Sequence, residues 1–310
     1  MLGKCVIDQS WRVDQGRYAL QTYRPIDNLE DPVNLDTYTT LDVNIDGRVA
    51  WITLDNPPVN VLSGTLIREL HEVLGALRED HSVRVIVFSS ANPEFFLAHV
   101  DIHILDEMDN LQEIADRNPD ANLFQGVGEL LRHQPQVTIV KLAGKARAGG
   151  AEFVAAADLT FAARETAGLG QTEVLMGIVP GGGGTQYLRE RVGRNRALEL
   201  LLTADLVDAD TAAAYGWINR AVPAPELDVV VDQMAKKIAA LSPELIAAAK
   251  RLVPPMDLAD GLKAEHDAWA ELVSGPLPPQ LMTRALEHGV QTPEGERDLE
   301  SVMRRITATL

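Results

Sequence analysis

The sequence has 310 residues, enough for one large domain or one domain with an appendage, and a fold of this size buries ~75% of its unfolded surface. Hydrophobic residues make up 46% and charged residues 24%, the proportions of a soluble globular protein. The net charge of −17, from 45 acidic and 28 basic side chains, repels polyanions and argues against nucleic acid or an anionic membrane as a partner.

Residues 1–40 are predicted to be an irregular extension on the body of the protein, because Pro25 and Pro32 interrupt any regular pattern. The opening segment has no apolar run of signal-peptide length, and no later segment approaches ~20 uninterrupted apolar residues. Cys5 is the only cysteine, which excludes an internal disulfide and is consistent with a reducing compartment. We therefore expect a cytoplasmic protein without a membrane anchor.

The stretch 39–62 contains two alternating apolar and polar runs around Asp46-Gly47, and predicts an antiparallel hairpin. Apolar residues at helical spacing after the possible N-cap Ser63 predict a helix over 63–80. Continuous apolar runs predict buried strands within 83–90, 136–144 and 159–163, with a further helix within 145–159. The order strand, strand, helix therefore recurs.

The second half is predicted to be helical. Four segments read as helices, over 181–202, 208–216, 225–241 and 242–253, and Gly216 is a C-terminal stop signal. After Pro254-Pro255, a separate helical tail is predicted over 258–310.

The segment "KARAGGAEFVAAADL" (145–159) places Glu152 directly behind two glycines at the head of a mostly uncharged helix. Glycines before a helix let the backbone approach a ligand, and the free N–H groups there favour developing negative charge. The alternative is a tight turn in which Glu152 complements the helix dipole.

A second acid, Glu173, lies between apolar neighbours in "GLGQTEVLMGIVPGGGGTQ" (168–186), ahead of four glycines. By itself this segment could be a flexible loop with a solvated charge. Two carboxylates on loops around one pocket would favour acid–base chemistry instead.

Both segments resemble the enoyl-CoA hydratase/isomerase, or crotonase, family. "RAGGAEFVAAADL" is similar to the family's glycine-rich segment, and residues 170–223 follow the family closely; the resemblance runs from about residue 41 to 253. It implies an α/β, crotonase-like spiral of repeated β-β-α units over 41–253. A C-terminal helical region over 254–310 and homo-oligomers, trimers or pairs of trimers, are also implied.

The resemblance implies a role for individual residues. Glu152 would hold and activate water, Glu173 would deliver a proton, and the backbone amides of Val100 and Gly149 would form an oxyanion hole. No metal and no cofactor are implied beyond the coenzyme A of the substrate. The residues implied to bind the acyl-CoA are Val59, Ala98, His99, Asp101, His103 and Gly150.

The loop that carries Val100, the first of the two oxyanion loops, departs from the family pattern. His99 occupies a position in it that is usually glycine. His99, Asp101 and His103 alternate, so on an extended segment they could face one metal ion, although the resembling motifs bind none. His103 also replaces a lysine near the nucleotide of coenzyme A. A basic cluster could compensate, or could simply be solvated: Lys141, Lys145 and Arg147.

The function expected from the resemblance is that of a 2-enoyl-CoA hydratase, an enzyme of fatty acid metabolism. Adding water across a thioester-conjugated double bond places negative charge on the carbonyl oxygen, which two fixed N–H donors stabilise. One alternative is another reaction of the family: isomerisation, acyl-CoA hydrolysis, C–C cleavage or hydration of an aromatic enoyl-CoA. The other is a non-catalytic oligomeric binding protein.

Overall fold

The computed structural model describes residues 38–116 and 121–309 of the chain. The extension predicted over 1–40 lies outside this range except for its last residues. Within the described residues, no helix is both long and apolar enough to cross a bilayer.

A six-stranded sheet forms the first layer, in the order β1-β2-β3-β5-β7-β10. The predicted hairpin is confirmed: β1 (Leu41–Asp46) and β2 (Val49–Leu54) pair antiparallel around Gly47, whose φ is 60°. The remaining pairs are parallel. They involve β3 (Val85–Ser90), β5 (Val137–Leu142), β7 (Leu159–Ala163) and β10 (Arg220–Val222).

A second, smaller sheet has the order β4-β6-β8-β9. Its first three strands, β4 (Phe95–Leu97), β6 (Lys145–Arg147) and β8 (Gly168–Gly170), run parallel, and β9 (Val207–Asp208) pairs antiparallel with β8. Strands that run parallel side by side end at the same edge of the sheet. The segments that follow these three strands therefore come together in space.

The predicted strand, strand, helix order is confirmed. In each unit a long strand joins the first sheet, a short strand joins the second sheet, and helix follows. The units are β3, β4, α2 (Met108–Ala115) and α3 (Leu123–Arg132); β5, β6 and α4 (Gly149–Ala156); and β7, β8 and α5 (Gly184–Val192). Parallel strands need such crossovers, and their repetition produces a spiral.

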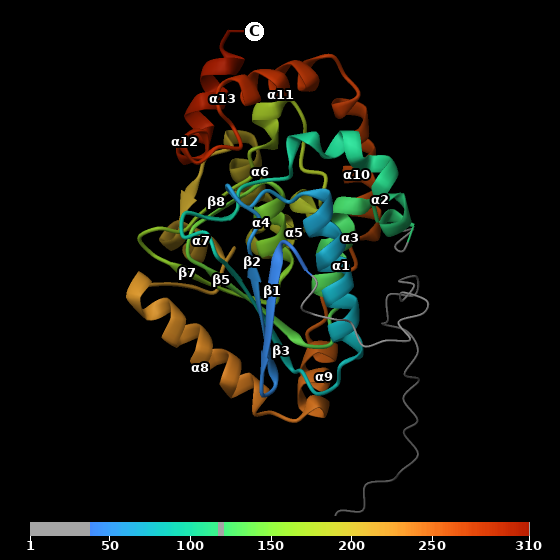
Figure 1. Ribbon diagram of the computed structural model, residues 1–310, viewed down its shortest axis with the longest axis vertical. Coiled ribbons are helices and arrows are strands. Elements are labelled where there is room, and N and C mark those ends of the chain that lie inside the picture. The colour runs from blue at the N-terminus through green and yellow to red at the C-terminus, as the bar shows by residue number, and fades with distance from the viewer. Residues whose placement is uncertain (1–37, 117–120, 310) are drawn as a thin grey trace, which may run out of the picture.

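The helices cover both faces of the spiral. α1 (Gly64–Glu79) begins after Ser63, whose side chain accepts a hydrogen bond from the Leu66 N–H, as predicted. α6 (Arg194–Thr203), α7 (Ala209–Tyr215) and α9 (Pro243–Leu252) occupy predicted helical segments, and Gly216 ends α7 at φ 88°. α8 (Leu227–Ala239) contacts β2, β3, β5 and β7 along the first sheet (Figure 1).

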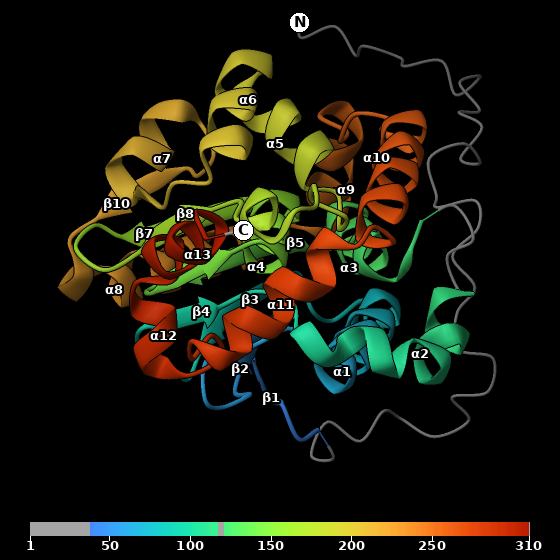
Figure 2. The same cartoon turned by 90° about the horizontal axis from the view of Figure 1, so that it is seen from above.

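The predicted C-terminal helices are α10 (Ala259–Val273), α11 (Leu277–Glu287), α12 (Pro293–Arg297) and α13 (Leu299–Thr307). They do not stand apart from the body of the chain. α10 contacts α5, while α11 and α13 contact the segment around Met176, where they enclose a second apolar cluster (Figures 1 and 2). The C-terminal segment therefore packs over the edge at which β4, β6 and β8 end.

Candidate active site

Three of the four proposed catalytic residues follow the short parallel strands directly. Val100 lies three residues after the end of β4, Gly149 two residues after β6, and Glu173 three residues after β8. The register pairs Leu97 with Ala146 and Arg147 with Gly170, so these strand ends are adjacent. Glu152 follows Gly149 in the first turn of α4.

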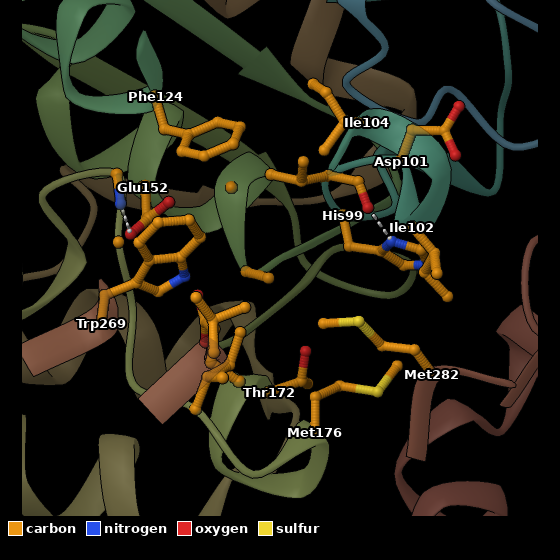
Figure 3. A pocket seen from close by; sticks show the side chains of 18 of the residues that line it. His99, Asp101, Ile102, Ile104, Phe124, Glu152, Thr172, Met176, Trp269 and Met282 are labelled. Atoms are coloured by element: carbon orange, nitrogen blue, oxygen red, sulfur yellow. Dashed lines mark hydrogen bonds between the residues drawn. The ribbon is translucent and has the colours of Figure 1, made fainter. Parts of the chain in front are cut away.

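A pocket opens at this edge, and it is lined by all four of these residues. Figure 3 shows it with side chains from the strand ends and from the C-terminal helices. Most of the remaining lining is apolar, including Ile102, Ile104, Phe124, Met176, Trp269 and Met282. The arrangement suits a ligand with an apolar body and one polar centre.

The amides of Val100 and Gly149 are both available to a ligand. The peptide before Val100 is held by Leu62, whose N–H donates to the His99 carbonyl at 2.8 Å. Within the described residues, neither the Val100 N–H nor the Gly149 N–H donates to a protein acceptor. A Cβ on Gly149 would lie 2.6 Å from the Val100 side chain, so the two loops meet closely only because residue 149 is glycine.

Glu152 is only 5% exposed, and its Oε1 accepts hydrogen bonds from the N–H groups of Gly182 and Gly184, both at 2.9 Å. Burial, together with the charge of Glu265, raises the pKa of Glu152 to about 8. A side chain on Gly182 would collide with the Glu152 carboxyl. The glycine run is therefore a carboxylate-binding turn, and the alternative of a loose loop is wrong.

Glu173 is also buried, at 8% exposure, so the alternative of a solvated loop charge is wrong. Burial and the nearby charge of Glu152 raise the pKa of Glu173 well above its ordinary value. The Gln171 amide, oriented with its nitrogen toward Glu173, donates to Oε1 at 2.9 Å and to Oε2 at 3.1 Å. The pocket thus holds two acids that both bind protons more tightly than in water.

A third buried acid, Glu265 on α10, was not anticipated from the sequence. It accepts hydrogen bonds from the N–H groups of Gly183 (2.6 Å) and Thr185 (2.9 Å) and from the side chains of Thr185 and Gln125. Successive N–H groups of this glycine-rich turn therefore donate alternately to Glu152 and to Glu265. α10 also contributes Trp269, which packs against Gly181 and makes an edge contact with Phe124 at 5.7 Å between ring centroids.

The residues expected to bind acyl-CoA are only partly brought together. His99 and Asp101 line the pocket, whereas the other four do not. Val59 and Ala98 are buried in a small apolar cluster with Phe95, and Gly150 lies against Leu97. The His103 side chain is 60% exposed and contacts Asp101 at 3.1 Å.

The expected basic cluster does not exist as one group. Lys141 pairs with Asp228 at 2.8 Å, and the Lys145 ammonium donates to the Arg297 carbonyl. Arg147 is fully buried, so the interpretation of it as a solvated charge is wrong. The part of the chain that the structure describes contains no group of three or more side chains arranged to bind a metal ion.

Comparison with known proteins places this chain in a family. The family model "Enoyl-CoA hydratase/isomerase" matches residues 44–273. A crystal structure from Streptomyces avermitilis, described as a "putative enoyl-CoA hydratase", is 65% identical and superposes with a TM-score of 0.86, covering 87% of this chain and 99% of that one.

Two curated relatives are more distant. The "Probable enoyl-CoA hydratase" of Rhizobium meliloti is 34% identical over 240 residues, 76% of this chain and 90% of that protein. The short-chain-enoyl-CoA hydratase of Clostridium acetobutylicum is 30% identical over 246 residues, 78% of this chain and 92% of that protein. The fold is the crotonase fold, and the chain belongs to the enoyl-CoA hydratase/isomerase family.

Proposed function

We propose that this protein is an enoyl-CoA hydratase that adds water across the double bond of a 2-enoyl-CoA thioester. The observation that carries the proposal is the placement of two buried carboxyl groups, Glu152 and Glu173, in one pocket with the unpaired amides of Val100 and Gly149. The similarity to proteins named enoyl-CoA hydratase supports it.

In the proposed reaction, the Val100 and Gly149 amides bind the thioester carbonyl oxygen and stabilise its developing negative charge. One such donor is worth ~3 to 4 kcal/mol in comparable sites. Glu152 takes a proton from water as the oxygen bonds to the β-carbon, and Glu173 gives its proton to the α-carbon. Water is thereby added without a further cofactor.

The different surroundings of the two acids support this division of roles. Glu152 accepts two backbone N–H groups on one oxygen, which favours its carboxylate. Glu173 accepts hydrogen bonds from the Gln171 side chain but, within the described residues, none from the backbone N–H of another residue, and burial and the charge of Glu152 raise its pKa. The pair therefore keeps one proton on Glu173 when Glu152 ionises.

The apolar lining supports a fatty acyl group as the rest of the substrate, with coenzyme A leaving the pocket. Val59, Ala98, His103 and Gly150 stay part of the proposed acyl-CoA site, although none of them lines the pocket. Val59, Ala98 and Gly150 are buried and would act indirectly, whereas the exposed His103 would act outside the pocket. Assembly into trimers or pairs of trimers, as the family resemblance implies, is part of the proposal.

The assay is the loss of conjugated-thioester absorbance when the purified protein is mixed with crotonyl-CoA. We expect turnover by the wild type and a loss of at least ~100-fold in kcat for Glu152→Gln and for Glu173→Gln, since each removes a proton-transfer group. Asp267→Asn, on the exposed face of α10, is the matched control. An inactive wild type, or glutamine variants as fast as the wild type, would contradict the proposal.

A further inference from the structure

Four buried or nearly buried ionisable side chains lie directly behind the two oxyanion loops. His99 immediately precedes Val100, and Arg147 lies two residues before Gly149. Their partners, Glu296 on α12 and Glu300 on α13, come from the C-terminal helices. These four residues are named the buried ion cluster.

The contacts form a chain of alternating charge. His99 Nε2 lies 2.9 Å from Glu296 Oε1, and Glu296 Oε2 lies 3.8 Å from Arg147 Nη1. Arg147 donates to both carboxylate oxygens of Glu300, at 2.6 and 3.1 Å. The side chains of Arg147 and Glu296 are 0% exposed, that of His99 8% and that of Glu300 13%.

Both ring nitrogens of His99 face acceptors. Nδ1 lies 2.6 Å from the Val100 carbonyl oxygen, and Nε2 faces the Glu296 carboxylate (Figure 3 shows the first contact). A neutral imidazole has only one N–H, so it cannot donate to both acceptors. A protonated ring can, and it also brings the net charge of the buried ion cluster to zero. Burial of a net charge would be far more costly.

We propose that His99 is a positioning residue of the oxyanion hole, held as an imidazolium by Glu296 so that the C-terminal helices fix the backbone that presents the Val100 amide. The proposal rests on the function proposed above. The Nδ1–H of His99 donates to the Val100 carbonyl, and the Leu62 N–H donates to the His99 carbonyl, so Val100 is anchored on both sides. Arg147 connects the Gly149 loop to the same helices through its ion pairs with Glu296 and Glu300.

The groups that face His99 set its charge state. Glu296 from α12 favours the cation, while burial and Arg147 from β6 oppose it, and the balance raises the pKa of His99. Glu296 in turn keeps a pKa below its ordinary value because of His99, a hydrogen bond from the Gln291 N–H and Arg147, which outweigh its burial. Glu300 lies against Arg147 and compensates its charge.

The first test is independent of turnover. In protein labelled with nitrogen-15 at histidine, the signals of His99, assigned by their loss in His99→Asn, should show both ring nitrogens protonated at neutral pH. In Glu296→Gln the ring should lose one proton at the same pH. A neutral ring in the wild type would overturn the proposal whether or not the protein is a hydratase.

The second test separates the two contacts of His99. The amide of His99→Asn can replace Nδ1 toward the Val100 carbonyl, whereas that of His99→Gln can replace Nε2 toward Glu296. With crotonyl-CoA we expect kcat to fall about 10- to 100-fold in His99→Gln and Glu296→Gln, less in His99→Asn, with little change in KM. The kcat of the double variant, His99→Gln with Glu296→Gln, should be no lower than that of either single variant.

The matched control is His288→Asn, which removes an exposed imidazole whose Nδ1 also contacts a backbone carbonyl, that of Arg284 at 2.8 Å. It should retain the wild-type kcat. Folded His99→Gln and Glu296→Gln variants with wild-type kcat would overturn the proposal, and so would single-variant losses that add up in the double variant. If the variants fail to fold, the protonation state of His99 in the wild type decides whether the proposal holds: an imidazolium supports it and a neutral ring overturns it.

Discussion

Single residues carry the chemistry because their burial changes how tightly they hold protons. Glu152 and Glu173 could be recognised from the sequence, since each stands beside a glycine motif that resembles a family pattern. Glu265 and Glu296 could not, because the partners that connect them to the site, Gly183 and His99, lie 82 and 197 residues away in the chain. One signal did exist: Leu262, Glu265 and Trp269 follow helical spacing, which places an acid on the apolar face of α10.

The raised pKa values predict a pH profile. Glu152 must be ionised to accept a proton and has a pKa of about 8, so kcat/KM should rise about tenfold per pH unit below pH 8. It should fall at higher pH as Glu173, whose pKa is also raised, loses the proton it donates. Steady-state kinetics with crotonyl-CoA across this range checks both limbs. A profile already flat from about pH 5 would contradict it, since an unperturbed glutamic acid ionises near 4.3.

At the scale of the elements, long strands and helices could be predicted and short strands could not. The hairpin, the three apolar strands and the capped helix after Ser63 each carry a local pattern, and all are confirmed. β4, β6 and β8 have three residues each, too few for periodicity, and they exist because neighbouring turns of the spiral pair with them. Those strands are the ones that position the site.

The helix α10 connects the C-terminal segment to the acid–base pair through Glu265. Burial raises the pKa of Glu265, whereas its hydrogen bonds lower it. Glu265→Gln should lower the pKa of Glu152, because it removes the neighbouring charge, and should therefore move the acidic limb of the pH profile to lower pH. It should also reduce the free energy of unfolding by ~1 to 3 kcal/mol, because an NH₂ group would face N–H and O–H donors.

Urea unfolding and the pH dependence of kcat/KM measure these two effects. The exposed acid Asp267 on the same helix provides the control, since Asp267→Asn loses only its surface pair with Lys263. An unchanged acidic limb in folded Glu265→Gln would show that Glu265 does not set the proton affinity of Glu152.

For the molecule as a whole, the fold brings distant segments to one edge of the small sheet. The spiral supplies Val100, Gly149 and Glu173, and the C-terminal helices of the same chain supply Trp269, Met282 and the acids behind the site. The family resemblance predicted the spiral and the helical tail. It did not predict that the tail would pack on the pocket, because the resemblance ended near residue 253 and the tail carries no matching motif.

The most direct test of the account is to follow the atoms of water into the product. The protein is incubated with crotonyl-CoA in water labelled with heavy oxygen, and separately in deuterated water, and the products are analysed by mass spectrometry. We expect an intact hydroxyacyl-CoA with the heavy oxygen on its β-carbon and deuterium on its α-carbon. Heavy oxygen in a free carboxylate, or an unchanged acyl-CoA mass with a shifted double bond, would contradict hydration.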